Sequence, residues 1–194
     1  CNWESQQARE QERVETHAFR LGSSTRHAHA AIPPLFCSSH IGDITLVVLG
    51  DVEVMEMIDG IADGKSALFH GNITVKVDGT LAADDLVHEV PDGDSGSTFI
   101  GSIDVSVGKD LVVDGNLVKE LGASSYDNPF VGHVSLHVGG DVRGPDVERT
   151  SYFMYEFGNN FTGGITVSID GSVHATHMLS RLALKGWSKL RGDV

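Results

Sequence analysis

Histidines are the first residues of this chain to test for chemistry, because an imidazole can bind a metal ion or move a proton near neutral pH. The sequence of 194 residues has ten of them, and four fall in close pairs, His27 with His29 and His174 with His177. Histidine pairs at such spacings do ligate metals, but a site needs a third ligand and groups that orient the first two. Neither pair has a third ligand or orienting groups that the sequence reveals, so we predict no metal site and no cofactor.

Aspartates are the second candidates, because two carboxyl groups are the minimum that glycoside hydrolysis requires. Asp104, Asp110 and Asp141 fall at outward positions of successive repeats, which are described below. Aspartate at such positions commonly keeps a surface soluble. The sequence also has no glycine-rich phosphate loop, nucleophile elbow or Ser/His/Asp arrangement. We therefore predict no catalytic residues, and the alternative function is a β-helical polysaccharide lyase or hydrolase.

Three short motifs have structural explanations. Residues 92–96 (DGDSG) have the oxygen density of a calcium loop without its regular acidic spacing, so we expect a solvated turn. Residues 191–193 (RGD) match an integrin-type tripeptide, but Gly192 belongs to the glycine column of the repeat. The glycosylation sequons at Asn72 and Asn160 recur because the repeats do.

Bulk composition narrows the class of protein. There are 14 Lys and Arg residues against 27 Asp and Glu, a net charge of −13, which argues against nucleic acid and anionic membranes as partners. No apolar run is long enough to insert into a membrane. Many glycines, few prolines and short runs rich in Val, Ile and Thr favour an all-β fold. Cys1 and Cys37 are too few to decide between a disulfide and free thiols.

The elements that would position these residues come from an internal repeat, which begins at a glycine. Its starting glycines are Gly42, Gly71, Gly101, Gly132 and Gly163, and a truncated sixth copy begins at Gly192. The spacings are 29, 30, 31, 31 and 29 residues, which is typical of a solenoid or related array. The sequence begins at Cys1 without a methionine and stops inside a repeat, so we expect a fragment or a processed product.

Apolar and small polar residues alternate within each repeat, as in a strand with one buried face. The inward column of the first copy contains Ile44, Leu46, Val48, Val52 and Val54. By the same parity, His133 and His137 should face solvent. A further column of aromatic residues precedes the glycines, namely Phe69, Phe99, Phe130 and Phe161. Stacked rings would contribute about 0.5–1.5 kcal/mol per pair, and contact of Phe99 with its neighbours on both sides tests the solenoid.

Each repeat has a second glycine between its two apolar runs, as at Gly50 or Gly79. A bend in a continuing strand keeps the inward face inward. A three-residue hairpin would also keep it, so an antiparallel β-sandwich binding module is the second alternative. The variable remainder of each repeat predicts a third strand with loops, and so a three-sided coil.

The two ends of the chain differ from the repeats. Residues 1–22 have helix-forming composition, and we expect a short helix or an irregular lead-in. Residues 23–41 include Pro33 and Pro34 and should form a loop that caps the first coil. Residues 178–192 also have a composition that suits a local helix. The predicted domains are thus a lead-in or cap over residues 1–41 and repeats over residues 42–194.

Tandem units of the form GxIxVxVxGxVxV over residues 42–194 resemble the shafts of filamentous-haemagglutinin-like exoproteins, which bacteria export by two-partner secretion. This resemblance implies a right-handed parallel β-helix, here of about five coils, in a secreted or cell-surface protein. It implies a structural or adhesive shaft without catalysis. Its partners would be neighbouring coils of a larger chain, end-to-end copies, or a host surface or glycan.

Overall fold

The fold is all-β in every part of the chain that the computed structural model describes. The described backbone covers residues 17–21, 28–32, 40–62, 66–91, 96–122, 128–144, 152–157, 160–174, 177–182 and 189–191. The described side chains lie within residues 40–62, 66–91, 96–122, 128–144 and 161–174. Among these residues there is no helix long and apolar enough to cross a membrane.

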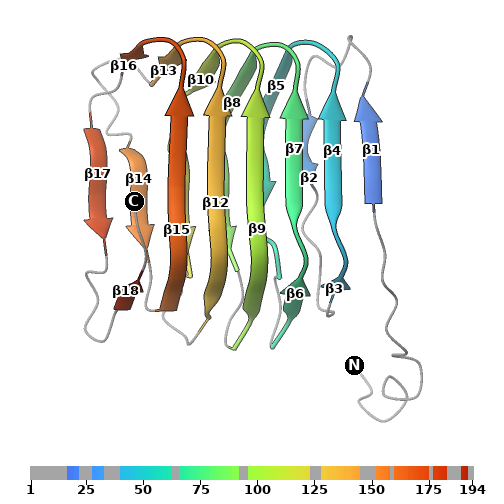
Figure 1. The fold of residues 1–194 in the computed structure, drawn as a ribbon, viewed down its shortest axis with the longest axis vertical. Coiled ribbons are helices and arrows are strands. Elements are labelled where there is room, and N and C mark those ends of the chain that lie inside the picture. Colours follow the sequence, from blue (N-terminus) through green and yellow to red (C-terminus); the bar gives the residue numbers. More distant parts are fainter. Residues whose placement is uncertain are drawn as a thin grey trace.

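The strands form two nine-stranded sheets, one in front of the other (Figure 1). The first sheet has the order β1 (His17–Leu21), β4 (Ile44–Val48), β7 (Ile73–Val77), β9 (Thr98–Val107), β12 (Phe130–Val138), β15 (Asn160–Ile169) and β18 (Lys189–Arg191). The short strands β3 (His40–Ile41) and β6 (Leu68–His70) pair with each other, and β6 also pairs with β9.

The second sheet has the order β16 (Val173–His174), β13 (Val142–Arg143), β10 (Leu111–Val113), β8 (Leu81–Val90), β11 (Val118–Leu121), β14 (Tyr152–Phe157) and β17 (His177–Leu182). Strand β5 (Val52–Asp59) joins β8 to β2 (Ala28–Ile32).

Neighbouring strands are parallel and lie one repeat apart in the sequence. Ile73 pairs with Ile44 on one side and with Ile103 on the other, and Val134 continues the same row. Parallel rows of equivalent residues define a β-solenoid, in which each circuit of the chain adds a rung to both sheets. The predicted stack of parallel strands is thus confirmed. The antiparallel sandwich is wrong for the described strands, because every ladder among them is parallel.

The second glycine of each repeat marks the bend from the first sheet to the second, as the alternation of side chains predicts. Val48 at the end of β4 and Val52 at the start of β5 are both buried, although they belong to different sheets. The predicted third strand of the repeat also exists, but it lies in the second sheet. That sheet has two consecutive segments, which we call its first and second limbs, and the third strand belongs to the second limb. Strand β8 runs through both limbs, pairing with β10 in one and with β11 in the other. Its adjacent residues Leu86 and Val87 are both buried, which breaks the alternation between the two limbs.

The aromatic column is a stack of parallel rings inside the solenoid. Phe99 lies 5.1 Å from Phe69 and 4.7 Å from Phe130, measured between ring centroids, with interplanar angles of 2° and 8°. Phe161 continues the stack at 5.3 Å from Phe130. His40 begins it at 5.1 Å from Phe69, an extension that the phenylalanine spacing did not predict. The ring contacts that we set as the test of the solenoid are therefore present.

The starting glycines lie where the backbones of successive rungs come closest. A Cβ atom built on Gly132 would overlap the carbonyl oxygen of Gly101, and Gly101 itself has φ +149°. Residues with a side chain rarely adopt such a φ and could not fit the space. The glycine column is therefore a packing requirement of the stack.

Three expectations about the ends of the chain are wrong. Residues 28–32, which we expected in a loop that caps the first coil, form β2, which pairs with β5. Residues 17–21, which we expected in a helix or an irregular lead-in, form β1, and β1 pairs in register with β4. Residues 178–182, part of the segment 178–192 that we expected to be locally helical, lie in β17, which pairs with β14. Pairing with a neighbouring rung overrides helix propensity in the latter two places. Residues 1–16 and 33–39, with both cysteines, lie outside the described residues.

Candidate functional site

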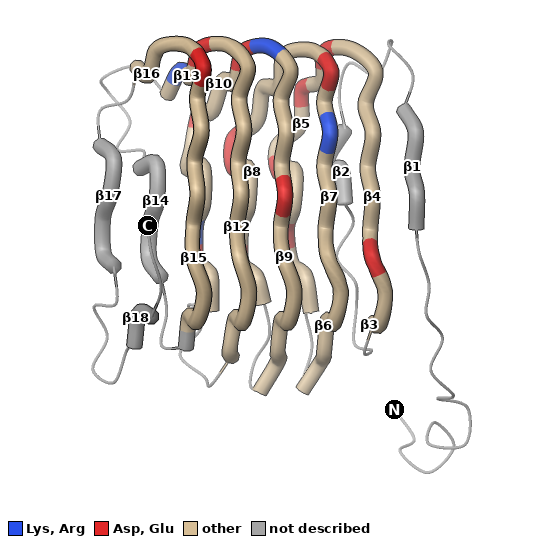
Figure 2. Tube along the Cα trace, viewed as in Figure 1, with Lys and Arg blue, Asp and Glu red and all other residues tan. Residues whose placement is uncertain are grey.

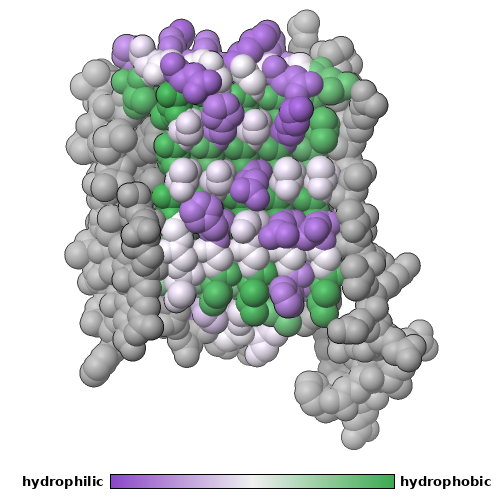
Figure 3. Space-filling view, viewed as in Figure 1, coloured by the Kyte–Doolittle hydropathy of each residue, from purple (hydrophilic) through white to green (hydrophobic). Residues whose placement is uncertain are grey.

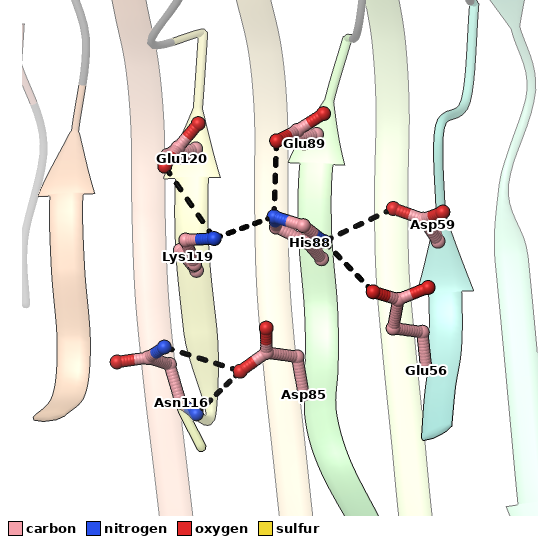
Figure 4. Close-up of polar contacts among 8 residues, drawn as sticks. All are labelled: Glu56, Asp59, Asp85, His88, Glu89, Asn116, Lys119 and Glu120. Carbon is pink, nitrogen blue, oxygen red and sulfur yellow. Dashed lines mark hydrogen bonds and ion pairs between the residues drawn. The ribbon is translucent and has the colours of Figure 1, made fainter. Parts of the chain in front are cut away.

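Charged residues are distributed unevenly over the solenoid. They are sparse along the first sheet and gather at the turns that join it to the second sheet (Figure 2). The outer face of the first sheet instead carries rows of small and polar side chains that cross its strands (Figure 3). A second concentration of charge lies on the second sheet, where β5, β8 and β11 run side by side (Figure 4).

We call this second concentration the His88 cluster. It consists of Glu56, Asp59, Asp85, His88, Glu89, Asn116, Lys119 and Glu120. The parallel register assembles it, because Asp59, His88 and Lys119 occupy one row across the three strands. Glu56 and Asp85 occupy another row, one turn of the chain apart.

The imidazole of His88 is the centre of the cluster, and its side chain is only 13% exposed. Its Nδ1 atom lies 3.3 Å from Oε1 of Glu56 and 3.2 Å from Oδ1 of Asp59. Its Nε2 atom lies 3.1 Å from Oε1 of Glu89 and 2.8 Å from Nζ of Lys119. Nδ1 thus faces two carboxylates, whereas Nε2 faces one carboxylate and one ammonium group.

The two contacts at Nε2 exclude each other as hydrogen bonds. A protonated Nε2 donates to Glu89, whereas an unprotonated Nε2 accepts from Lys119. Burial of the ring lowers the pKa of His88, and the charge of Lys119 lowers it too. The hydrogen bond and charge of Glu89, together with the charge of Asp85, outweigh both and raise that pKa to about 9. At neutral pH, His88 is therefore a cation that donates to Glu89.

The carboxylates near His88 crowd one another. Burial, followed by the charge of Glu56, raises the pKa of Asp59 above its ordinary value of 3.8. Asp85 has hydrogen-bond donors of its own, since Asn116 donates from its backbone N at 2.5 Å and from Nδ2 at 3.1 Å.

Backbone conformation places two of the carboxylates. Glu89 has φ +50° and Glu120 has φ +58°, so both are in the left-handed region, which costs a side-chain-bearing residue about 1–2 kcal/mol. Gly60, which follows Asp59, has φ +59°. The same backbone turn thus recurs after each member of the row formed by Asp59, His88 and Lys119.

Two groups of three residues in the cluster have the chemistry of metal ligands. They are Glu56, Asp85 and His88, and His88, Glu89 and Glu120, and the ligand atoms of each lie within 4.8 Å of one another. Imidazole and carboxylate together suit a divalent transition metal. The sequence-based prediction of no metal site did not consider these residues.

The three aspartates singled out from the sequence do not form a site together. Asp104 lies on β9 of the first sheet, whereas Asp110 and Asp141 lie at the turns into the second sheet. Oδ1 of Asp110 accepts a hydrogen bond from the backbone N of Asp141 at 2.9 Å, and Asp141 binds Ser172 in the same way at 2.9 Å. These carboxylates fasten one rung to the next.

The sequence-derived histidines are also dispersed. His137 is exposed, as the parity predicts, and its Nε2 lies 3.9 Å from Asp170, whereas His133 is half-buried. His174 is exposed at the end of β16. The side chains of His27, His29 and His177 lie outside the described residues, as do residues 92–95 and 192–194.

The sequons follow the repeat, as predicted. Their middle residues, Ile73 and Phe161, are buried in the core. Asn72 uses its Oδ1 to accept a hydrogen bond from the backbone N of Ser102 at 3.0 Å.

His88 is the functional candidate that the motif search missed. The sequence does contain an indication of this site, because Asp59, His88 and Lys119 are spaced by 29 and 31 residues, which matches the repeat period. Extending the repeat register past the second glycine would have aligned them. No family model, no curated protein and no solved structure matches this chain.

Proposed function

We propose that this chain is a structural shaft, a right-handed β-solenoid of about five coils that acts as a rigid spacer or adhesive segment of a secreted or cell-surface protein. The observation that supports it most is the unbroken stacking of equivalent residues. The phenylalanine stack and both sheets pass from rung to rung with constant register.

Polar contacts at the turns support the same function. Oδ1 of Asp51 accepts a hydrogen bond from the backbone N of Thr80 at 2.8 Å, and Asp43 holds Asn72 in the same way at 2.7 Å. Each rung is thus tied to the next by its core, its sheets and its turns, which suits a load-bearing rod. The repeat pattern is the basis for the proposed likeness to filamentous-haemagglutinin-like shafts. Neighbouring coils, copies joined end to end, and host surfaces or glycans are the proposed partners.

Single-molecule stretching of the chain between two handle domains tests the shaft. A coil of 30 residues should release roughly 100 Å of contour length, at about 3.3–3.6 Å per residue. We expect successive release steps of this size or its multiples. Release of the whole chain without measurable resistance would refute a load-bearing role.

The second candidate is a β-helical carbohydrate-active enzyme. The observation that favours it is the His88 cluster, in which an imidazole, an ammonium and carboxylates meet on one sheet. Incubation with acidic and neutral polysaccharides, followed by measurement of new reducing ends and unsaturated products, tests it. Saturable turnover that Lys119→Met abolishes would replace the shaft by an enzyme.

A further inference from the structure

The two sides of His88 differ in how their negative charge is balanced. On the Nε2 side, the ammonium of Lys119 lies 2.8 Å from His88 and 3.6 Å from Oε1 of Glu120. On the Nδ1 side, Glu56 and Asp59 have His88 as their ion-pair partner, and no other described cation lies within ion-pair distance. The Nε2 side therefore has the ammonium of Lys119, whereas the carboxylates on the Nδ1 side have only the imidazole of His88.

The fold forces these carboxylates together. Glu56 and Asp85 are direct neighbours across the β5–β8 ladder, and like charges in that position repel. Parallel strands are only about 4.8 Å apart, so the two carboxylates project from adjacent backbone positions. A positive charge between them would turn this repulsion into attraction.

The Nδ1 atom of His88 gives an independent indication of a ligand. It is buried and has no hydrogen-bond partner, although the oxygens of Glu56 and Asp59 lie 3.3 Å and 3.2 Å away. Buried polar atoms in folded proteins nearly always have a partner. This nitrogen faces the carboxylates (Figure 4), so a metal ion bound there would replace the proton that the imidazolium carries.

We propose that Glu56, Asp85 and His88 bind one divalent cation of the zinc class, through one oxygen of each carboxylate and through Nδ1. Ligands at about 2.0–2.2 Å around a tetrahedral zinc ion lie roughly 3.3 Å from one another. The three ligand atoms already lie within 4.8 Å of one another, so small side-chain rotations complete the site. Asp59 or a water molecule supplies the fourth ligand. The imidazole selects zinc over calcium and magnesium, which prefer oxygen ligands alone.

The site would act as a clip between coils. Glu56 comes from β5, and Asp85 and His88 come from β8, one circuit of the chain later. A bound ion would thus tie two rungs together at charged positions of the β5–β8 ladder. This role does not depend on whether the solenoid is a shaft or an enzyme.

Titration of the chelator-treated full chain with Zn²⁺, followed by calorimetry and by the thermal midpoint, tests the clip. We expect one saturable site whose affinity falls at least about tenfold in Glu56→Gln, Asp85→Asn and His88→Gln. Asp85→Asn keeps the oxygen that accepts from Asn116 and so removes only charge. Matched controls are Glu53→Gln, an exposed carboxylate on the same strand, and His137→Gln, an exposed histidine elsewhere. Both should leave the affinity unchanged.

Nitrogen NMR of the histidine side chains provides a second readout, since Nδ1 of His88 should shift on zinc binding while His137 does not. Circular dichroism checks that each variant folds, and Glu56→Gln and Asp85→Asn decide the matter if His88→Gln does not fold. Absence of saturable binding would overturn the proposal. So would unchanged affinity in those two carboxylate variants, or loss of affinity in His137→Gln.

Discussion

Substitution in the phenylalanine stack gives the sharpest test of the fold. Phe99 is fully buried and contacts a ring on each side, Phe69 and Phe130. Phe99→Leu keeps a large apolar side chain but removes both ring contacts, so at about 0.5–1.5 kcal/mol per pair we expect a loss of about 1–3 kcal/mol. Phe99→Ala also leaves a cavity and should cost about 3–5 kcal/mol. Guanidinium unfolding followed by circular dichroism measures both.

A double-mutant cycle separates stacking from simple burial. Phe69→Leu combined with Phe99→Leu should show a coupling free energy of about 0.5–1.5 kcal/mol, because these rings are in contact. Phe69→Leu combined with Phe130→Leu should be additive within about 0.5 kcal/mol, because Phe99 lies between them. Equal coupling in the two cycles would refute the stack and, with it, the register of the first sheet.

Three further substitutions test other parts of the structure. Gly132→Ala should destabilise the chain by more than about 1 kcal/mol, because the new Cβ would overlap the carbonyl oxygen of Gly101; a neutral effect on the unfolding midpoint would contradict that packing. Asp141→Ala should cost about 0.5–1.5 kcal/mol through loss of the acceptor for Ser172, whereas Asp141→Asn, which keeps an acceptor oxygen, should cost less in the same assay. Because the pKa of His88 is raised from 6.5 to about 9, its protonation contributes stability that is full below pH 6.5 and is lost as the pH rises through 9. With a chelator present, we expect the native chain to have a larger unfolding free energy than His88→Gln at low pH, and this difference to shrink as the pH rises through that window. A difference that does not change with pH would contradict the raised pKa.

Much of the fold could be predicted because the information is local and repeated. Alternation in the run from Ile73 to Val77 identifies the buried face, and the same run one period later identifies its neighbour. The recurrence of phenylalanine then fixes the register independently. The ends were predicted wrongly because β1 and β17 have helix-forming composition, and only pairing with β4 and β14 makes them strands.

The candidate site was harder to predict than the fold. Each member of the His88 cluster is an ordinary polar or charged residue in a variable segment, and no short motif contains them. Glu56 and His88 come together only because β5 and β8 pair in register past the bend. Asp104 and Asp141, which both fall at outward positions of successive repeats, are in contrast separated by that same bend. Sequence columns predict neighbours along the stack more reliably than neighbours around a coil.

Constant register has a consequence for how this molecule changes in length. Gly71, Gly101 and Gly132 occupy equivalent positions, since each packs against the starting glycine of the preceding coil. Removal of residues 101–131 would place Gly132 against Gly71. Phe130 would be removed with that coil, and Phe161 would then stack on Phe99. A coil can therefore be lost or duplicated while every remaining neighbour keeps a partner of the same kind. Length in such a molecule is a quantity that recombination between repeats can adjust one coil at a time.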